Sequence, residues 1–192
     1  MAIPQKIGNE KIAYQGKIIE IVEQTMKIWD KEKIFEFARR SPGTRLIIVN
    51  DKHEILINKE WRSELNDYDY RLPWGKVFDT LNEYNASLMN NEDIVQQAIR
   101  WASKEAQEEC WLAISNLELF AISKCGATVV WDLYYFVTKD FIQLENNELE
   151  EWEHIISQER MNSDALKKLC VSQYFNEERS ALILLRYLED NK

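Results

Sequence analysis

Glycine is the residue that this sequence most clearly lacks, with 5 glycines against 7 tryptophans in 192 residues. Average usage of about 7% would give a chain of this length about 13 glycines. A mixed fold with many turns needs positions with positive φ, which glycine adopts without steric cost. We therefore expect other residues to stand at turns and helix ends where glycine is usual.

Cysteine and histidine are also scarce, which excludes several kinds of site. The three cysteines, Cys110, Cys125 and Cys170, form no spacing pattern, and an odd number cannot all pair within one chain. We expect reduced thiols in a reducing compartment. Nothing in the sequence pairs His53 or His154 with a nucleophile, so a catalytic triad is not indicated.

Long apolar runs and excess positive charge are absent as well. No run approaches the roughly 20 residues that span a bilayer, and the N-terminal MAIPQKIGNEK has no apolar signal core. The chain carries 33 acidic and 24 basic residues, a net charge of −9, which disfavours binding to nucleic-acid phosphates. We expect a cytoplasmic protein with no membrane or nucleic-acid partner, although a metal can still hold a small anionic substrate.

The residues that are present form a pattern of strands followed by helices. Alternating and β-branched runs predict strands at 17–28, 33–40, 44–50, 53–62, 117–123 and 128–138, and a strand broken by Pro73 at 70–78. Helical periodicity predicts helices at 92–110, capped by Asn90 or Asn91, at 163–170, capped by Ser163, and at 178–190. This order predicts an α+β fold with a mixed sheet between helices, N-terminal strands and C-terminal helices.

Three glutamates lie together on the helix predicted at 92–110. Glu105, Glu108 and Glu109 are spaced i, i+3, i+4, so they form one patch beside the apolar face of the helix. One interpretation is an acidic face in solvent. The other is a divalent-cation site, because Mg²⁺ binds carboxylate oxygens and keeps waters or substrate phosphates at its other positions.

Two segments that contain these glutamates resemble the signature of the Nudix hydrolase superfamily. They are RLPWGKVFD (71–79) and AIRWASKEAQEECWLAI (98–114), in which Gly75 matches the leading glycine and the three glutamates match the helix glutamates. The segments FARRSPGTRLIIV, KEWRSELNDYDYRLP and ISKCGATVVWDLYYFV look like the ADP-ribose and nucleotide-sugar pyrophosphatase branch. The resemblance therefore extends along most of the chain.

The resemblance implies an activity and a metal site. Members of this branch hydrolyse the pyrophosphate bond of ADP-ribose or a related nucleoside diphosphate sugar with Mg²⁺ or Mn²⁺. By this resemblance, Glu105 and Glu109 are expected to bind the metal together with the backbone carbonyl of Trp74. Glu108 is expected to act as a catalytic residue, either as a further metal ligand or by orienting one of the ligands.

Further roles follow from the same resemblance. A loop glutamate often handles the attacking water in this branch, and we expect Glu153 rather than Glu150 or Glu151 to do so here. Arg62 is expected to contact a substrate phosphate, with an ordinary surface arginine as the alternative. Gly75 is expected to line the substrate site.

The resemblance also implies how the chain is organised. Residues 1–40 are expected to form an N-terminal strand segment that two copies exchange in a homodimer, and residues 41–192 to form the Nudix hydrolase domain. The sequence departs from the family pattern at Lys104, where the family has arginine. The family's early glutamate has no counterpart at its usual spacing, although Asp79 and Glu83 lie nearby.

Five tryptophans stand where glycine or another small residue is expected, at positions 29, 74, 101, 111 and 152. Trp111 replaces the glycine that ends the helix of the signature, and Trp29 lies in a predicted hairpin turn. By contrast, Trp61 and Trp131 lie in predicted strands, where aromatic residues are common. One hypothesis is that the source reads the codon UGA as glycine, and the other is drift in a protein that is losing activity.

Two main functions remain open at this point. The three glutamates favour a metal-dependent pyrophosphatase, whose substrate pocket the tryptophans partly block. The missing early glutamate and the bulky tryptophans favour a nucleotide-binding module that does not cleave its ligand. A third reading, a structural or protein-interaction domain, has only the acidic surface in its favour.

Overall fold

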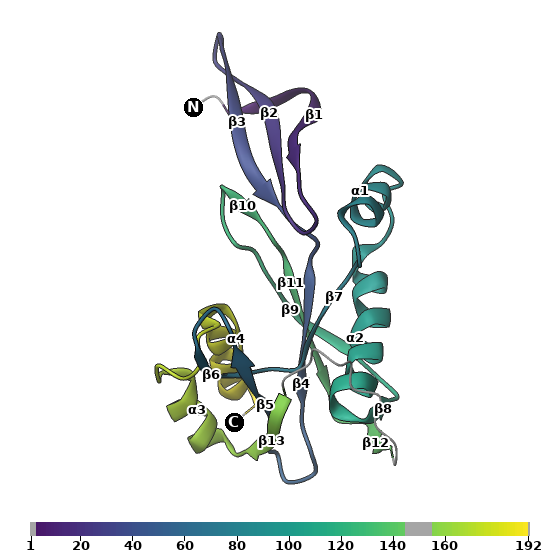
Figure 1. Cartoon of the computed structure of the whole chain (residues 1–192), viewed down its shortest axis with the longest axis vertical. Coiled ribbons are helices and arrows are strands. Elements are labelled where there is room, and N and C mark those ends of the chain that lie inside the picture. The colour runs from purple at the N-terminus through teal and green to yellow at the C-terminus, as the bar shows by residue number, and fades with distance from the viewer. Residues whose placement is uncertain (1–2, 145–154, 192) are drawn as a thin grey trace.

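The structure is a computed structural model that describes residues 3–144 and 155–191. Its elements are β1 (Gln5–Gln15), β2 (Glu20–Ile28), β3 (Lys31–Arg39), β4 (Gly43–Ile48), β5 (Ile55–Arg62), β6 (Asp67–Arg71), β7 (Trp74–Lys76), α1 (Leu81–Met89), α2 (Ile94–Cys110), β8 (Leu112–Ile114), β9 (Glu118–Ser123), β10 (Val129–Val130), β11 (Leu133–Thr138), β12 (Phe141–Gln143), β13 (Ile155–Met161), α3 (Ser163–Cys170) and α4 (Glu178–Asp190), as labelled in Figure 1. No helix in this described part has the length and apolar character needed to cross a membrane.

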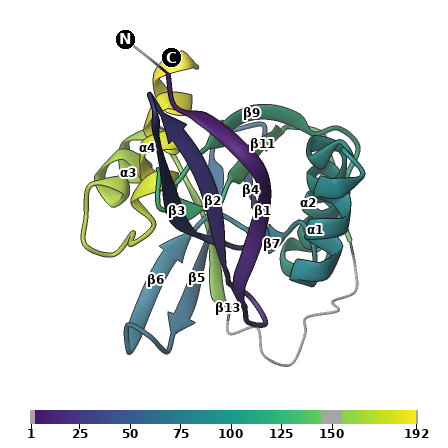
Figure 2. The same ribbon diagram turned by 90° about the horizontal axis from the view of Figure 1, so that it is seen from above.

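Four strands in the order β7-β4-β11-β9 form the central sheet. β4 and β11 are parallel, whereas β7 and β9 run antiparallel to them at the two edges. Every residue of β4 is buried, as expected for a strand that is covered on both faces. Figure 2 shows α1 and α2 on one side of this sheet and α3 and α4 on the other.

Each face of the central sheet packs against its own core. Leu46 and Ile48 of β4 join the core beside α2, whereas Ile47 joins the core beside α3 and α4. This division follows from the two-residue period of a strand, which points successive side chains to opposite faces. The predicted α+β fold, with a mixed sheet between helices, is confirmed.

A second sheet, in the order β13-β5-β6, lies beside the central sheet and is antiparallel throughout. The strand predicted at 70–78, with a break at Pro73, is two strands, because the chain leaves β6 after Arg71 and starts β7 at Trp74. Pro73 lies between them and has no N–H to offer a ladder. The break turns the chain from this sheet into the central one.

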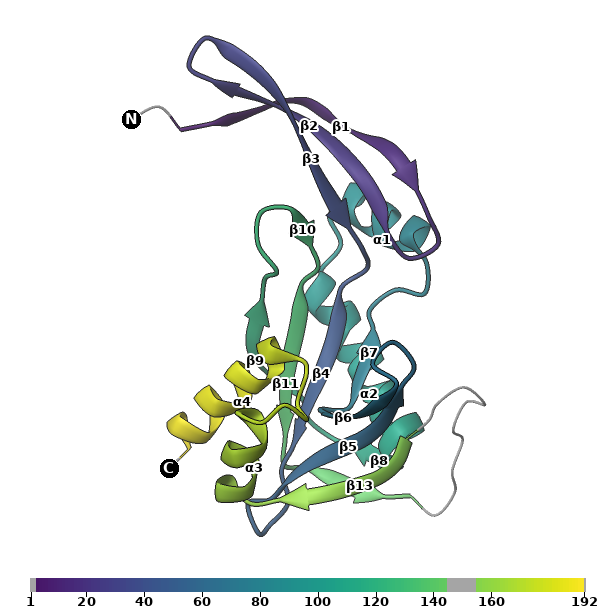
Figure 3. The ribbon, with the colours of Figure 1, turned by 60° about the vertical axis from the view of Figure 1, so that its left-hand side comes forward.

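The N-terminal strands β1, β2 and β3 form an antiparallel sheet that extends beyond the end of the central sheet, with the short β10 added in parallel to β3 (Figures 1 and 3). β1 is absent from the sequence predictions. Nearly every residue of β1 is exposed, so no alternation of apolar and polar residues marks it.

Helix starts differ from the predictions because neighbouring polar residues compete for the cap. Asp93, not Asn90 or Asn91, caps α2, and its carboxylate accepts from the backbone N–H groups of the first turn at 2.9 and 3.4 Å. Asn90 instead ends α1. Asn162 caps α3, and Ser163, the predicted cap, is the first residue inside that helix.

Candidate functional site

The three glutamates lie in the last two turns of α2, beside β7. Glu109 is buried, with only 4% of its surface exposed, whereas Glu105 and Glu108 are half-buried. The neighbouring small residues Ala102 and Ala106 are fully buried against the central sheet. Close packing of this alanine face fixes α2 on the sheet and so holds the glutamates at the edge formed by β7.

β7 runs so close to α2 that a side chain at position 75 meets Glu105. A Cβ built on Gly75 would lie 2.2 Å from Cγ of Glu105 and 2.3 Å from its Oε1. Cβ atoms do not approach other heavy atoms this closely, so any other residue would displace the glutamate. The glycine therefore has a specific role, which is to let Glu105 lie against the β7 backbone.

A cavity of about 450 Å³ lies between α2, β5 and β7. Glu105, Glu108 and Glu109 line it together with Arg62, Trp74 and Gly75. Its volume is within the range of about 300–1,000 Å³ that is usual for small-molecule sites. The structure thus brings together every site residue expected from the sequence except Glu153, which is outside the described residues.

Hydrogen bonds hold Glu109 in place. Its Oε2 accepts from the backbone N–H of Trp74 at 3.1 Å and from Nδ2 of Asn58 at 3.3 Å. Gln158 of β13 donates to Oδ1 of Asn58 at 3.0 Å and to the backbone carbonyl of Glu109 at 2.9 Å. The sequence analysis missed Asn58 and Gln158, which bind Glu109 from two strands distant in the chain.

Two of the cations at the cavity, Lys104 and Arg62, are ion-paired with neighbouring carboxylates. Nζ of Lys104 lies 3.1 Å from Oε1 of Glu108, one helical turn away. Arg62 ends β5 and pairs with Glu64, to which its Nε donates at 2.8 Å. Nη1 of Arg62 also lies 3.8 Å from Oε2 of Glu60. Arg62 is therefore at the cavity, as the substrate-binding expectation requires, and also makes the ion pairs of an ordinary arginine.

Glu60 is a further carboxylate of the cavity that the sequence analysis missed. Only 6% of its surface is exposed, and burial raises its pKa, although Arg71 and Arg62 oppose that rise. Its Oε2 accepts from Nε1 of Trp74 at 3.4 Å. Its buried Oε1 has no hydrogen-bond partner among the residues that the structure describes. A usable signal was present, because Asn58, Glu60 and Arg62 alternate along β5 and so share one face.

The acidic residues near the missing early glutamate take separate roles. Glu83 completes a capping box at the start of α1, where it accepts from the backbone N–H of Thr80 at 3.2 Å and of Asp79 at 3.1 Å. Asp79 lines the cavity with the helix glutamates. The insert between β7 and α2 therefore contains a capped helix.

The donor set of the cavity suits a hard divalent cation, because carboxylate oxygens are the ligands that Mg²⁺ and Mn²⁺ prefer. Over residues 3–144 and 155–191, however, no three acidic, cysteine or histidine side chains converge closely enough to hold one ion in this conformation. The carboxylates that line the cavity are therefore of the right type to bind a metal ion. Their side chains would have to rotate to bring three ligands together.

The tryptophans at small-residue positions fall into two groups. Trp29 in the β2–β3 turn and Trp111 at the end of α2 have φ of 55° and 58°, in the left-handed region that favours glycine. Trp74 and Trp101 line the cavity instead, and Nζ of Lys104 lies 4.9 Å from the Trp101 ring centroid. Trp152 is outside the described residues. The expectation of left-handed backbone is thus met at two of the positions.

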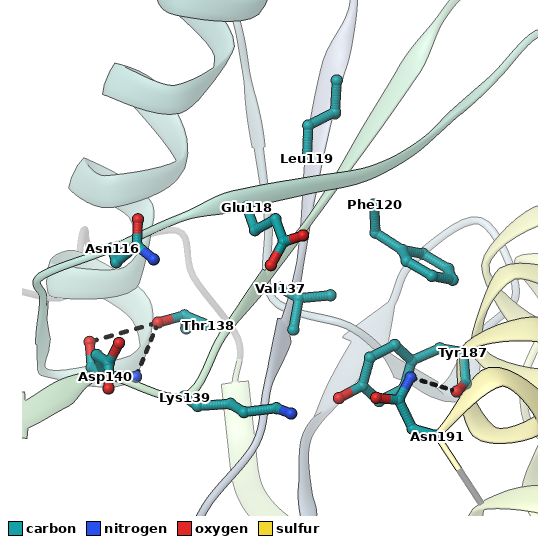
Figure 4. Close-up of a pocket in the computed structure, with 10 residues that line it drawn as sticks. All are labelled: Asn116, Glu118, Leu119, Phe120, Val137, Thr138, Lys139, Asp140, Tyr187 and Asn191. Carbon is teal, nitrogen blue, oxygen red and sulfur yellow. Dashed lines mark hydrogen bonds between the residues drawn. The ribbon is translucent and has the colours of Figure 1, made fainter.

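A second cavity, also of about 450 Å³, lies near the ends of β9, β11 and α4 (Figure 4). Several of its polar groups bond to local backbone. Oγ1 of Thr138 bonds to the backbone of Asp140 at 3.3 Å, and Nδ2 of Asn191 donates to the carbonyl of Tyr187 at 2.9 Å. Since the two volumes are equal, the clustered carboxylates make the first cavity the better candidate site.

Comparison with known proteins bears on the fold. No protein-family model matches the sequence, and no curated protein is similar to it in sequence. A solved structure described as an ADP compounds hydrolase superposes with a TM-score of 0.68 at 16% sequence identity. The match covers 100% of this chain and 97% of that chain. The chain therefore shares the whole α+β fold of that solved protein.

Proposed function

We propose that this chain is a Mg²⁺- or Mn²⁺-dependent hydrolase that cleaves the pyrophosphate bond of ADP-ribose or a related nucleoside diphosphate sugar. One observation carries the proposal. Glu105, Glu108 and Glu109 line a single cavity of about 450 Å³ in a fold shared with an ADP compounds hydrolase. Glu105, Glu109 and the carbonyl of Trp74 would hold the ion, which would supply Lewis-acid chemistry toward the pyrophosphate group.

The protein's own residues support this chemistry in distinct ways. The hydrogen bonds from Trp74 and Asn58 keep Glu109 oriented at the cavity. Glu108 lies beside Glu109 with its charge partly offset by Lys104. Arg62 of β5 provides a cation in the cavity for a substrate phosphate. Glu153 is proposed to orient the attacking water.

The test is release of AMP from ADP-ribose with and without Mg²⁺. Glu105→Gln and Glu109→Gln should each lower the metal-dependent rate at least 100-fold, because each removes a proposed ligand. Glu118→Gln, which lines the second cavity, is the matched control and should leave the rate unchanged. Equal activity in all three variants would refute the assignment of the site.

A second candidate is a module that binds such nucleotides without cleaving them. It is favoured by Trp74 and Trp101, whose rings line the cavity, and by the unassembled ligand set in the described residues. Calorimetry with ADP-ribose separates the two functions. Binding in the presence of Mg²⁺ without any AMP release would identify the module.

The tryptophans themselves call for a proposal about decoding. We propose that UGA codons, read as glycine in the source, stand at positions 29, 74, 101, 111 and 152. The positive φ of Trp29 and Trp111 supports this proposal. The gene should then carry UGA at these five positions and UGG at Trp61 and Trp131. UGG at the five positions would refute it and favour drift.

A further inference from the structure

The side chain of Trp74 is held by groups that lie within hydrogen-bonding or cation–π distance of its indole. The guanidinium carbon of Arg45 lies over its ring at 5.6 Å from the centroid, and that of Arg71 at 5.9 Å. Guanidinium groups within about 6 Å of an aromatic face attract the ring electrostatically. The indole Nε1–H donates to Oε2 of the buried Glu60 at 3.4 Å. These contacts are those that a flat heteroaromatic ring with an N–H donor requires.

The charges around the ring are largely neutralised. Arg45 is buried and forms a bidentate pair with Glu177, whose Oε2 accepts from its Nε at 2.6 Å. Arg71 donates from Nε to Asp69 at 2.9 Å and lies 3.9 Å from Oε2 of Glu60. With both arginines paired, this place favours a neutral ring over a phosphate, since a phosphate would compete with the existing carboxylates.

Glu60 retains acceptor capacity at this place. Trp74, Arg62 and Arg71 all approach its Oε2. Its Oε1 is buried without a hydrogen-bond partner in the part of the chain that the structure describes. A buried acceptor normally has a partner, and the single N–H of an indole serves only one oxygen. An exocyclic amino group carries two N–H donors, so it offers the carboxylate more donor capacity than the single N–H of an indole.

We infer that the Trp74 indole occupies a built site for the amino-bearing base of a nucleotide, such as adenine. Arg45 and Arg71 would lie over the base, and Glu60 would accept hydrogen bonds from its amino group. This inference rests on the proposed nucleotide substrate and names the part of the site that selects its base. In the chain as it stands, the protein's own ring fills that site, and a small residue at position 74 opens it.

The test is adenosine binding by calorimetry without added metal, so that neither phosphate nor an ion contributes. Trp74→Gly should bind adenosine at least 10-fold more tightly than the unchanged chain. Trp74→Phe, which keeps a ring in the site, is the matched control and should not gain affinity. Trp74→Ala repeats the test if the glycine variant fails to fold, as judged by its thermal unfolding.

Inosine, which lacks the exocyclic amino group, tests the role of Glu60. The opened variant should prefer adenosine to inosine at least 10-fold, because a site that hydrogen-bonds a substrate group rejects the analogue without it. Glu60→Leu in that variant, which removes both acceptor oxygens, should abolish the preference. Folded Trp74→Gly and Trp74→Ala variants that bind adenosine no better than the unchanged chain would overturn the inference, as would equal binding of the two nucleosides.

These outcomes are separable from failure of the proposed function. Adenosine binding with no AMP release from ADP-ribose in any variant refutes hydrolysis and leaves the base site standing. AMP release without a gain in adenosine affinity refutes the base site and leaves hydrolysis standing.

Discussion

At the scale of single residues, a positive φ marks the tryptophans that stand where the backbone favours glycine. Trp111 is the C-cap of α2 and has a left-handed backbone conformation. Its backbone N–H donates to the carbonyls of Ala106 and Gln107. Glycine adopts this conformation freely, whereas a residue with a Cβ is strained there by roughly 1–2 kcal/mol. Its buried indole N–H also has no partner among the described residues.

Replacing Trp111 by glycine should therefore stabilise the fold. We expect Trp111→Gly to raise the free energy of unfolding by about 1 kcal/mol, since it removes the strain and the unpartnered donor. Urea denaturation followed by circular dichroism measures the change. Trp111→Ala keeps a Cβ and loses the ring, so it should not be stabilised. A glycine variant less stable than the alanine variant would contradict this account of the helix end.

At the scale of elements, one ion pair ties the central sheet to the C-terminal helix. Arg45 of β4 pairs with Glu177, the residue that precedes α4, and Ser180 of α4 also donates to this carboxylate. Burial alone would raise the pKa of Glu177, but Arg45 and these hydrogen bonds outweigh it and lower the pKa from its ordinary value of 4.5 to about 2. The carboxylate is thus more stable as an anion in the folded chain than in the unfolded chain.

This depressed pKa predicts how stability depends on pH. A lowered folded-state pKa contributes stability that is complete above pH 4.5 and is lost as the pH falls toward 2. Glu177→Gln should lower the free energy of unfolding at pH 7 by about 3 kcal/mol. The gap to the unchanged chain should close as the pH approaches 2. Glu178→Gln, at an exposed neighbour, is the control. A gap that does not depend on pH would contradict the ion-pair account.

The same elements show what the sequence does and does not reveal. The regular period of α2 and the buried run in β4 were readable, because packing on one or both faces leaves a pattern in the residues. β1 was not readable, because almost all of it is exposed. The spacing of Glu105 and Glu109 on one helix predicted the patch that lines the candidate site. Gln158 was not predictable, because tertiary packing alone brings β13 to α2. Asn58 and Glu60 share one face of β5 with Arg62, but only the fold shows that this face meets α2.

At the scale of the whole molecule, the N-terminal sheet stands out because large apolar side chains are exposed on both of its faces. Ile34 and Phe35 are adjacent on β3, so they point to opposite faces, and they are 66% and 46% exposed. Ile12, Tyr14 and Trp29 add exposed apolar surface on the same sheet. Such a patch is typical of an interface. This supports the proposal that residues 1–40 form the contact of a homodimer.

Disrupting this surface should therefore yield a monomer. We expect the unchanged chain to sediment as a dimer at micromolar concentration, and the double variant Ile34→Glu, Phe35→Glu to sediment as a monomer. Leu182→Glu places the same charge at an exposed leucine of α4, and it should leave the dimer intact. A monomeric unchanged chain, or a dimer that survives the double variant, would contradict the proposal.

The most direct test of the central claim is release of AMP from ADP-ribose with Mg²⁺. It compares the unchanged chain with a version that carries glycine at positions 29, 74, 101, 111 and 152. We predict that the glycine version turns over in a metal-dependent manner and that the unchanged chain does so more slowly, since Trp74 and Trp101 line the cavity. If both versions are folded and neither releases AMP, the proposed pyrophosphatase activity is wrong.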